Sequence, residues 1–236
     1  MTSQAPQTEQ QAENYLSEWI SNRQFDEFTD RLNLHHQLGS YISISREAGV
    51  GGSHIAQLVG KKLGWEVIDK QIVDFIAEKY DVSKMIVENL DEKNSALVGE
   101  FFSSLILDRD FSQPAYLHQL NRLVLLAAIH GNVVIVGRGA GFILPREKGL
   151  SVRLIATEKV RIDKFAKRKD ISVQEAKKQV HRIDTQRKEF IKKNYAADCS
   201  NPLQFDLTIN TTDQTDEQTA SIIANASNSL FGFCDK

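Results

Sequence analysis

A strand that runs into a glycine-rich turn and then a helix constrains the fold of this chain most. The residues Tyr41-Ile42-Ser43-Ile44-Ser45 predict a strand, and Gly49, Gly51 and Gly52 follow it closely. A helix is expected next, because apolar residues recur at helical spacing and a glycine stands at its end: Ile55, Leu58, Val59, Leu63 and Gly64. A strand joined to a helix in this way is the unit from which parallel α/β sheets are built.

Four later segments predict further strands: Glu66–Ile68, Val133–Val136, Val152–Ala156 and Leu207–Asn210. The second of these is entirely β-branched, as expected for a strand covered on both faces of a parallel sheet. Helical patterns separate the strands, and the last helix opens with Thr215 and Gln218 at the spacing of a capping box. The chain is therefore predicted to form an α/β fold, a five-stranded parallel sheet flanked by helices.

The same patterns predict how the chain is organised along its length. Residues 1–12 are rich in Gln, Thr and Ser and are expected to be a disordered tail. Apolar residues at helical spacing predict an N-terminal helical extension over 13–38, which packs onto the domain or onto the partner in a homodimer. Residues 39–236 are expected to form the main domain.

Composition excludes several classes of function. The net charge of the 236 residues is only −2, which makes no case for binding nucleic acid or an anionic membrane. No apolar run approaches the ~18 residues that span a bilayer, and the polar N-terminus lacks a signal pattern. Cys199 and Cys234 show no paired metal spacing, and neither do the histidines. We therefore expect a soluble cytoplasmic protein that binds neither nucleic acid nor membrane.

One segment departs from this mild overall charge. Between Arg161 and Lys193 there are twelve Lys or Arg against five Asp or Glu, a net charge of +7 on a body that is otherwise acidic. Ser172 and Glu175 predict a capping box inside it, and apolar residues keep to one helical face. On charge alone, the segment fits an ordinary solvated pair of helices. Few aromatic side chains accompany the charges, so no platform for stacking nucleic-acid bases is predicted.

The glycine-rich turn is a candidate anion site. Backbone N–H groups in the first turn of a helix lack intrahelical partners, and glycines allow phosphate oxygens to approach them closely. Aligned with the P-loop pattern G-x-x-x-x-G-K-[ST], the first glycine is replaced by Arg46, the lysine by Gly52, and the hydroxyl position is Ser53. An ordinary tight turn between strand and helix remains the alternative.

Further motifs, in order, resemble those of the cytidylate-kinase-like family, whose loop reads S-R-E-x-G-S-G-G. The motifs are Ser45-Arg46-Glu47-Ala48-Gly49-Val50-Gly51-Gly52, Val67-Ile68-Asp69, Leu90-Asp91-Glu92-Lys93, Gly137-Arg138-Gly139, Arg182-Ile183-Asp184-Thr185-Gln186-Arg187 and Asp206-Leu207-Thr208-Ile209-Asn210. The likeness covers roughly residues 41 to 230. It implies a P-loop kinase fold that binds ATP with Mg²⁺, and a basic lid at about 158–195.

The resemblance also implies roles for individual residues. The loop residues Gly49, Val50, Gly51, Gly52 and Ser53 would hold the nucleotide phosphates, with the Ser53 hydroxyl on Mg²⁺. Arg138 would clamp the phosphate of the acceptor, and Asp69 would orient the acceptor or a metal-bound water. Arg161, Arg182 and Arg187 would act from the lid on the nucleotide and the transferring phosphoryl group, with Asp184 holding Arg187 at i+3 spacing. A surface ion pair is the alternative for Arg138, and a helix N-cap is the alternative for Asp69.

Two positions depart from cytidylate kinases. Gly52 removes the lysine that neutralises the β- and γ-phosphates, and loss of one such contact costs ~10²–10³ in rate. Gly139 stands where those enzymes carry Asp after Gly-Arg. Arg46 and Lys70 are the residues that could replace the lost charge.

The sequence is therefore compatible with three functions. The first is an Mg-ATP-dependent phosphotransferase for a nucleoside monophosphate or a similar small phosphate-bearing acceptor. The second is a non-catalytic nucleotide-binding regulator that signals through its N-terminal helices. The third is a kinase of another small metabolite, since the fold does not fix the substrate.

Overall fold

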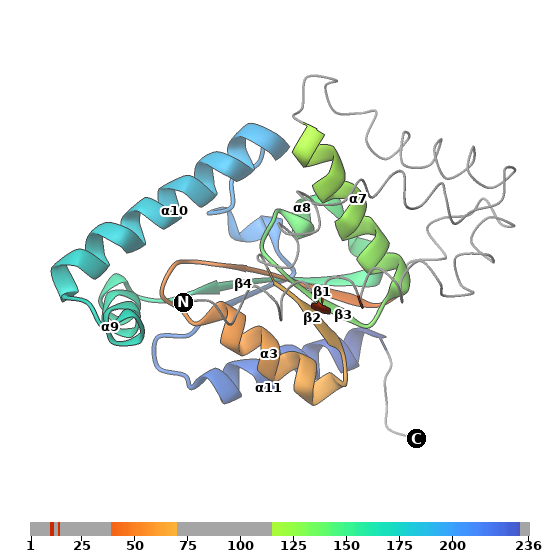
Figure 1. The fold of residues 1–236 in the computed structure, drawn as a ribbon. Helices are drawn as coiled ribbons and strands as arrows, with labels where there is room; N and C mark the ends of the chain where they lie inside the picture. Colours follow the sequence, from red (N-terminus) through yellow and green to blue (C-terminus); the bar gives the residue numbers. More distant parts are fainter. Residues whose placement is uncertain (1–9, 12–13, 15–38, 70–114, 232–236) are drawn as a thin grey trace, which may run out of the picture. The chain divides into compact units, whose positions relative to one another are not determined.

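The computed structural model describes residues 10–11, 14, 39–69 and 115–231 (Figure 1). Most of the predicted tail and of the N-terminal extension, and also Lys70, lie outside these ranges. The chain divides into two compact units, one of which is formed by Ser40–Val67 together with the chain from Asn132 onward. This unit contains the sheet and the glycine-rich turn.

The sheet has five strands in the order β2-β3-β1-β4-β5. The strands are β1 Tyr41–Arg46, β2 Glu66–Ile68, β3 Val133–Val136, β4 Gly149–Ile155 and β5 Leu207–Asn210. Strand β1 pairs in parallel with both β3 and β4, and β4 pairs in parallel with β5. The predicted α/β fold with a parallel sheet is confirmed.

Strand β1 is the centre of the sheet, and its apolar side chains form the core with those of its neighbours. Ile42 and Ile44 are fully buried, as are Val134 and Val136 on β3. Strand β4 begins earlier than the predicted Val152, because the whole length of β1 pairs with it from Tyr41 opposite Gly149 onward. The carboxyl ends of β1, β3 and β4 therefore lie together at one edge, where ligands bind in open α/β sheets.

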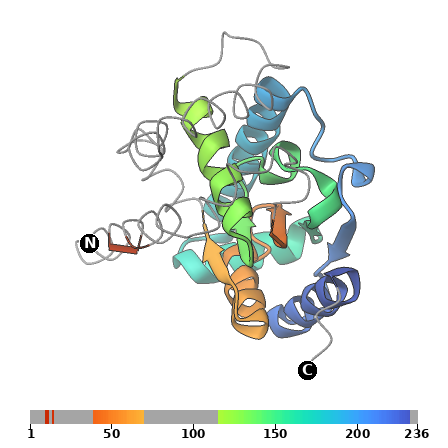
Figure 2. The ribbon, with the colours of Figure 1, turned by 90° about the vertical axis from the view of Figure 1, so that its right-hand side faces the viewer.

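Helices cover both faces of this sheet. Helices α3 (Gly52–Leu63) and α11 (Asp216–Phe231) pack side by side on one face, as Figures 1 and 2 both show. Figure 1 shows α10 (Val173–Tyr195) and the short α8 (Ala140–Ile143) on the other side. The rings of Phe142 and Tyr195 stack with centroids 6.2 Å apart and join these two helices.

Two short 3₁₀ turns complete the connections of this unit. They are η2 (Arg146–Lys148), which leads into β4, and η3 (Pro202–Gln204), which precedes β5. The side chain of Asn201 caps η3 by accepting a hydrogen bond from the Leu203 N–H group.

The predicted helix boundaries are confirmed by their caps. Helix α3 ends at Gly64, which adopts the left-handed conformation with φ 68°. The Ser172 hydroxyl accepts a hydrogen bond of 3.2 Å from the Glu175 N–H group at the start of α10. At the start of α11, Thr215 and Gln218 exchange side-chain hydrogen bonds with each other's N–H groups.

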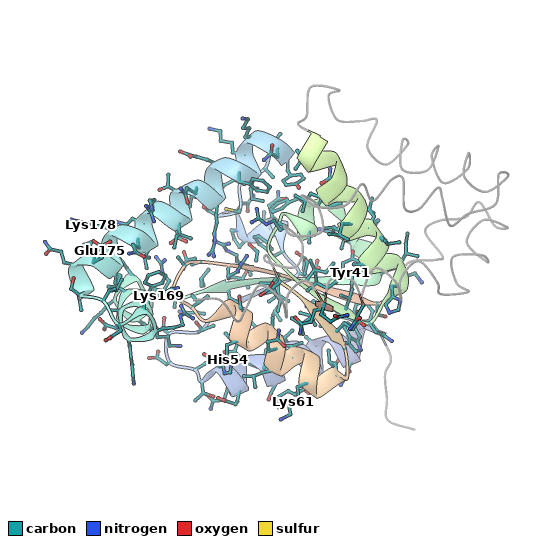
Figure 3. All side chains as sticks on the ribbon, viewed as in Figure 1. Tyr41, His54, Lys61, Lys169, Glu175 and Lys178 are labelled. Carbon is teal, nitrogen blue, oxygen red and sulfur yellow. The ribbon has the colours of Figure 1, made fainter. Side chains whose placement is uncertain are left out.

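The basic segment forms a hairpin of α9 (Glu158–Lys169) and α10, which spans the range predicted for the lid. One face of the hairpin is apolar and packs against Ala48 of the glycine-rich turn. The hairpin residues of this small core are Ile162, Phe165, Ala166, Ala176 and Val180. Many of its charges point into solvent, and Figure 3 shows Lys169, Glu175 and Lys178 projecting from the end of the hairpin. Most of the basic charge is therefore an ordinary solvated face, as charge alone suggested.

The described part of the other unit is dominated by α7 (Ala115–His130). Its apolar residues from Leu123 to Ile129 are all buried, as predicted for a helix that is hydrophobic nearly all round. Gly131 ends the helix with φ 79° and donates its N–H group to the Ala127 carbonyl. Among the helices in the described ranges, none combines the length and the apolar character needed to cross a membrane.

Replacing Gly60 by Ala should destabilise this domain by about 1–3 kcal/mol, the usual cost of overpacking. A Cβ at this position would overlap the Val67 side chain and lie 2.8 Å from the Trp65 carbonyl oxygen. Urea denaturation followed by circular dichroism measures the effect, and the exposed Gln57→Ala on the same helix is the control. A Gly60→Ala protein as stable as that control would contradict the close helix–strand contact.

Candidate phosphate-binding site

The glycine-rich turn has the geometry of an anion site. Gly49 and Gly51 adopt positive φ values of 93° and 84°, which side chains other than glycine rarely tolerate. Gly51 is the N-cap of α3 and offers no side-chain cap, while its carbonyl accepts the first helical hydrogen bond, from Ile55. The N–H groups of the first turn therefore point out of the helix end, where the helix dipole favours an anion.

Close packing gives the turn its shape. A Cβ on Gly49 would overlap the backbone carbonyl of Arg161 on α9, so glycine is required there for two reasons. On the α11 side, the Asp216 carboxylate lies 3.1 Å from the position that a Cβ on Gly51 would take. The turn is thus held between the starts of two helices.

Ser53 fits the role of a single metal ligand. It is the second residue of α3 and its side chain is exposed beside the turn. Mg²⁺ prefers an octahedron of oxygens and takes most of them from water and substrate phosphates, so one hydroxyl from the protein suffices. Within the described residues no group of three or more His, Cys, Asp or Glu side chains gathers around a metal position.

Arg46 occupies the space beside Gly52 where a lysine side chain would begin. Its Cγ atom lies 2.7 Å from the position of a Cβ on Gly52. The side chain continues toward the end of β3, where its guanidinium would overlap a Cβ on Gly137. Both glycines therefore leave room for this arginine, and the turn lacks a lysine but not a nearby cation.

Arg161 is buried and holds the turn to the hairpin. Its guanidinium lies 3.2 Å from a Glu47 carboxylate oxygen and 2.5 Å from an Asp184 carboxylate oxygen. Asp184 makes its direct ion pair with Arg161, and it acts on Arg187, the i+3 partner predicted from the sequence, as a nearby charge. The sequence analysis predicted that Arg161 binds the nucleotide, and that role stays a prediction. The contacts of Arg161 in this structure are with other residues of the protein.

The backbone of the turn is fixed through the same group of charges. The Ala48 N–H group donates to Asp184 over 2.7 Å, and the Ala48 carbonyl accepts from Arg161 over 3.2 Å. Glu47 accepts a further hydrogen bond of 3.1 Å from the Ala156 N–H group, beyond the end of β4. Every one of these bonds involves a charged partner, which strengthens it.

A cavity of about 230 Å³ lies beneath α10 at this edge of the sheet. Its cations outnumber its carboxylates, with Arg46, Arg153, Arg161, Arg187 and Lys188 against Glu47 and Asp184. Both carboxylates already pair with Arg161. The cavity therefore carries an excess of positive charge suited to an anion.

Arg153, which is buried, and Arg187, which is half-buried, contribute to this charge. Arg187 donates to the Arg46 carbonyl over 3.0 Å, and Arg153 donates to the Ser45 hydroxyl over 2.8 Å. Burial lowers the pKa of Arg187, and the nearby positive charge of Arg153 lowers it further, whereas Asp184 raises it. Both guanidinium groups stay charged at neutral pH, since an arginine is not deprotonated in a protein.

Arg153 was not predicted from the sequence. A charged residue in the middle of the apolar strand segment Val152-Arg153-Leu154 is the signal that could have identified it. It is only 8% exposed, and a buried arginine normally needs a partner.

The remaining predicted residues lie in different surroundings. Arg138 follows β3 with φ 54°, lies 5.9 Å from the centre of the Phe190 ring, and has its pKa lowered chiefly by burial. Arg182 is exposed on α10 and does not line the cavity. Asp69 directly follows β2 and belongs to the other unit, so its role stays a prediction.

At Gly139, a Cβ would overlap the Tyr195 ring, which explains why no Asp stands there.

Two comparisons of the sequence show which family this chain resembles. The model of the cytidylate kinase-like family matches residues 41–213. A protein named cytidylate kinase from Pyrococcus horikoshii is 28% identical over 163 residues, which are 69% of this chain and 82% of that protein.

Two solved structures are similar to this chain at lower sequence identity. An uncharacterized protein from Eubacterium ventriosum matches with a TM-score of 0.63 at 19% identity, over 82% of this chain and 99% of that one. Shikimate kinase from Bacteroides thetaiotaomicron matches with a TM-score of 0.46 at 17% identity, over the same shares of the two chains. The sheet topology and the family match confirm the predicted P-loop kinase fold.

Replacing Arg161 by Met should destabilise the protein by about 3 kcal/mol, because it leaves two carboxylates without their cation. Amide hydrogen exchange at Ala48 should also rise, since the clamp on the turn is lost. Lys177→Met is the matched control on the same hairpin, because Lys177 pairs with Glu158 in full solvent and contributes little. Equal stability and equal exchange in the two variants would contradict the clamp.

Proposed function

Since this chain belongs to the cytidylate kinase-like family, we propose that it is an Mg-ATP-dependent phosphotransferase. Its acceptor is a nucleoside monophosphate or a similar small phosphate-bearing molecule. One observation carries the proposal: an uncapped helix start at the glycine turn and a cluster of arginines lie at the same edge of the sheet. Phosphoryl transfer needs little more from a protein than positioning and neutralisation of charge.

The glycine turn is the donor side of the proposed site. The backbone of Gly49–Ser53 would hold the β- and γ-phosphates, and the Ser53 hydroxyl would take one position on Mg²⁺. The bound Mg²⁺ would neutralise charge on the phosphates. The turn is held rigidly by Arg161 and Asp184, so its N–H groups need little rearrangement when the charge develops.

The arginine cluster supports the acceptor side. Arg187 from α10 and Arg138 from the end of β3 are the candidates that would contact the acceptor and the transferring phosphoryl group, because a guanidinium matches phosphate with two parallel hydrogen bonds. The Pyrococcus relative, named a cytidylate kinase, favours a nucleoside monophosphate as that acceptor. Arg182 would join only if α10 moved, as lids do on closure, because it is exposed here.

A second function has one observation in its favour. Gly52 leaves the turn without its usual lysine, which suits a regulator that binds nucleotide without turnover.

A kinase of another small metabolite is the third candidate, since the cavity of about 230 Å³ is smaller than a whole nucleotide requires. The assay below separates the three.

Purified protein with Mg-ATP should phosphorylate at least one acceptor from a panel of nucleoside monophosphates and small phosphate-bearing metabolites. Phosphorus NMR identifies the product, and removal of Mg²⁺ by EDTA should abolish the reaction. Arg187→Met should lower kcat/KM by roughly 10²–10³, the usual loss of a transition-state contact. Lys178→Met, an exposed change on the same helix, is the matched control.

The outcomes of this assay separate the three functions. Binding of ATP by calorimetry without turnover of any acceptor would establish the regulator instead of the kinase. Turnover restricted to acceptors other than nucleotides would establish the metabolite kinase. Folded protein that neither binds nor turns over nucleotide would reject all three.

A further inference from the structure

We propose that Arg46 supplies the positive charge that a P-loop lysine supplies elsewhere, and that Gly52 is a glycine because this arginine lies across it. The proposal rests on the proposed phosphotransferase function and adds a catalytic residue to it. Arg46 stands at the first position of the loop pattern, six residues before the position where the lysine would be. The absence of a lysine at position 52 and the presence of an arginine at position 46 are therefore linked.

The path of the Arg46 side chain carries the proposal. Its Cβ, Cγ and Cδ atoms lie 3.1, 2.7 and 3.3 Å from the position of a Cβ on Gly52. Real Cβ atoms essentially never come within 3.0 Å of such a neighbour. A lysine at position 52 is therefore incompatible with the present position of Arg46, so the glycine is required rather than merely tolerated.

The far end of the same side chain lies over Gly137. A Cβ on this residue would overlap the guanidinium, with the Cζ atom at 3.1 Å. Gly137 also has φ 80° and donates its N–H group to the Ile44 carbonyl over 3.0 Å, which fixes it against β1. The aliphatic part of the side chain thus lies at the start of α3, on the donor side, and the guanidinium lies at the residue that precedes Arg138, on the acceptor side.

The backbone of Arg46 is held firmly, which gives the guanidinium a defined origin. Arg46 is the last residue of β1 and pairs in register with Leu154 on β4. Its carbonyl accepts the hydrogen bond from Arg187, so a second arginine lies directly beside it. A guanidinium presents its donors in a planar fork, and it can bridge oxygens of two phosphates where a lysine contacts one point.

This arrangement makes a specific prediction about double substitution. Arg46→Ala should lower kcat by roughly 10²–10³ while KM for the acceptor changes much less, as for loss of a transition-state contact. Gly52→Lys alone should also lower kcat, because the new side chain collides with Arg46. In the double variant Arg46→Ala, Gly52→Lys, the space is open and the conventional lysine is present. We expect the double variant to turn over at least tenfold faster than Arg46→Ala.

The controls separate charge from folding. Arg168→Ala, an exposed arginine on α9, should leave kcat unchanged. Thermal unfolding of each variant identifies any that fail to fold, and Arg46→Lys tests whether a shorter cation suffices. Full activity of folded Arg46→Ala, or a double variant no faster than Arg46→Ala, would overturn the proposal and leave the phosphotransferase function standing.

Absence of turnover by the wild type would overturn the phosphotransferase function alone. In that case the role of Arg46 can still be tested by measuring nucleotide binding. Calorimetry with Mg-ATP and with AMP should then show that Arg46→Ala weakens ATP binding at least tenfold, while the affinity for AMP changes less. An equal Kd for ATP in the wild type and in Arg46→Ala would overturn the role of Arg46. Absence of ATP binding by folded wild-type protein would overturn both proposals.

Discussion

The buried contact between Arg161 and the carboxylates of Glu47 and Asp184 is the interaction on which the site depends. It joins three elements that are far apart in the sequence: the turn after β1, helix α9 and helix α10. An ion pair shielded from water stabilises a protein only when further hydrogen bonds satisfy its charged groups. Here Asp184 accepts a hydrogen bond from the Ala48 N–H group, and Arg161 donates one to the Ala48 carbonyl. This contact therefore ties the basic hairpin to the glycine turn, and a closing lid would have to break it or hinge beyond it.

That constraint changes the meaning of the basic segment. A net charge of +7 suggests an arm that attracts phosphate, yet most of its cations are exposed to solvent, and Lys169 and Lys178 project from the end of the hairpin (Figure 3). The charge that matters is the smaller set around the cavity, where burial lowers the pKa of Arg187 and the positive charge of Arg153 lowers it further, against the opposing effect of Asp184. Like charges are held together in a buried place at a cost in free energy, and a bound phosphate would offset that cost.

Local patterns predicted much of the fold and less of the site. The five strands, the Gly64 stop and the two capping boxes all depend on neighbours within a few residues, so spacing alone identified them. The partner of Asp184 could not be found in this way, because Arg161 lies 23 positions away and Ala48 lies 136 away. The i+3 spacing predicted Arg187 as the partner of Asp184, whereas the direct ion pair of Asp184 is with Arg161 on α9.

The two departures from the usual kinase pattern have a common physical cause. At Gly52 the space of a side chain is taken by Arg46, and at Gly139 it is taken by the ring of Tyr195. The missing lysine and the missing aspartate each correspond to a place that a neighbouring side chain already fills. Each absent side chain is matched by a larger one that reaches the same place from another element. For the lysine, that neighbour is itself a cation, so the loss of charge at one position does not make the site neutral.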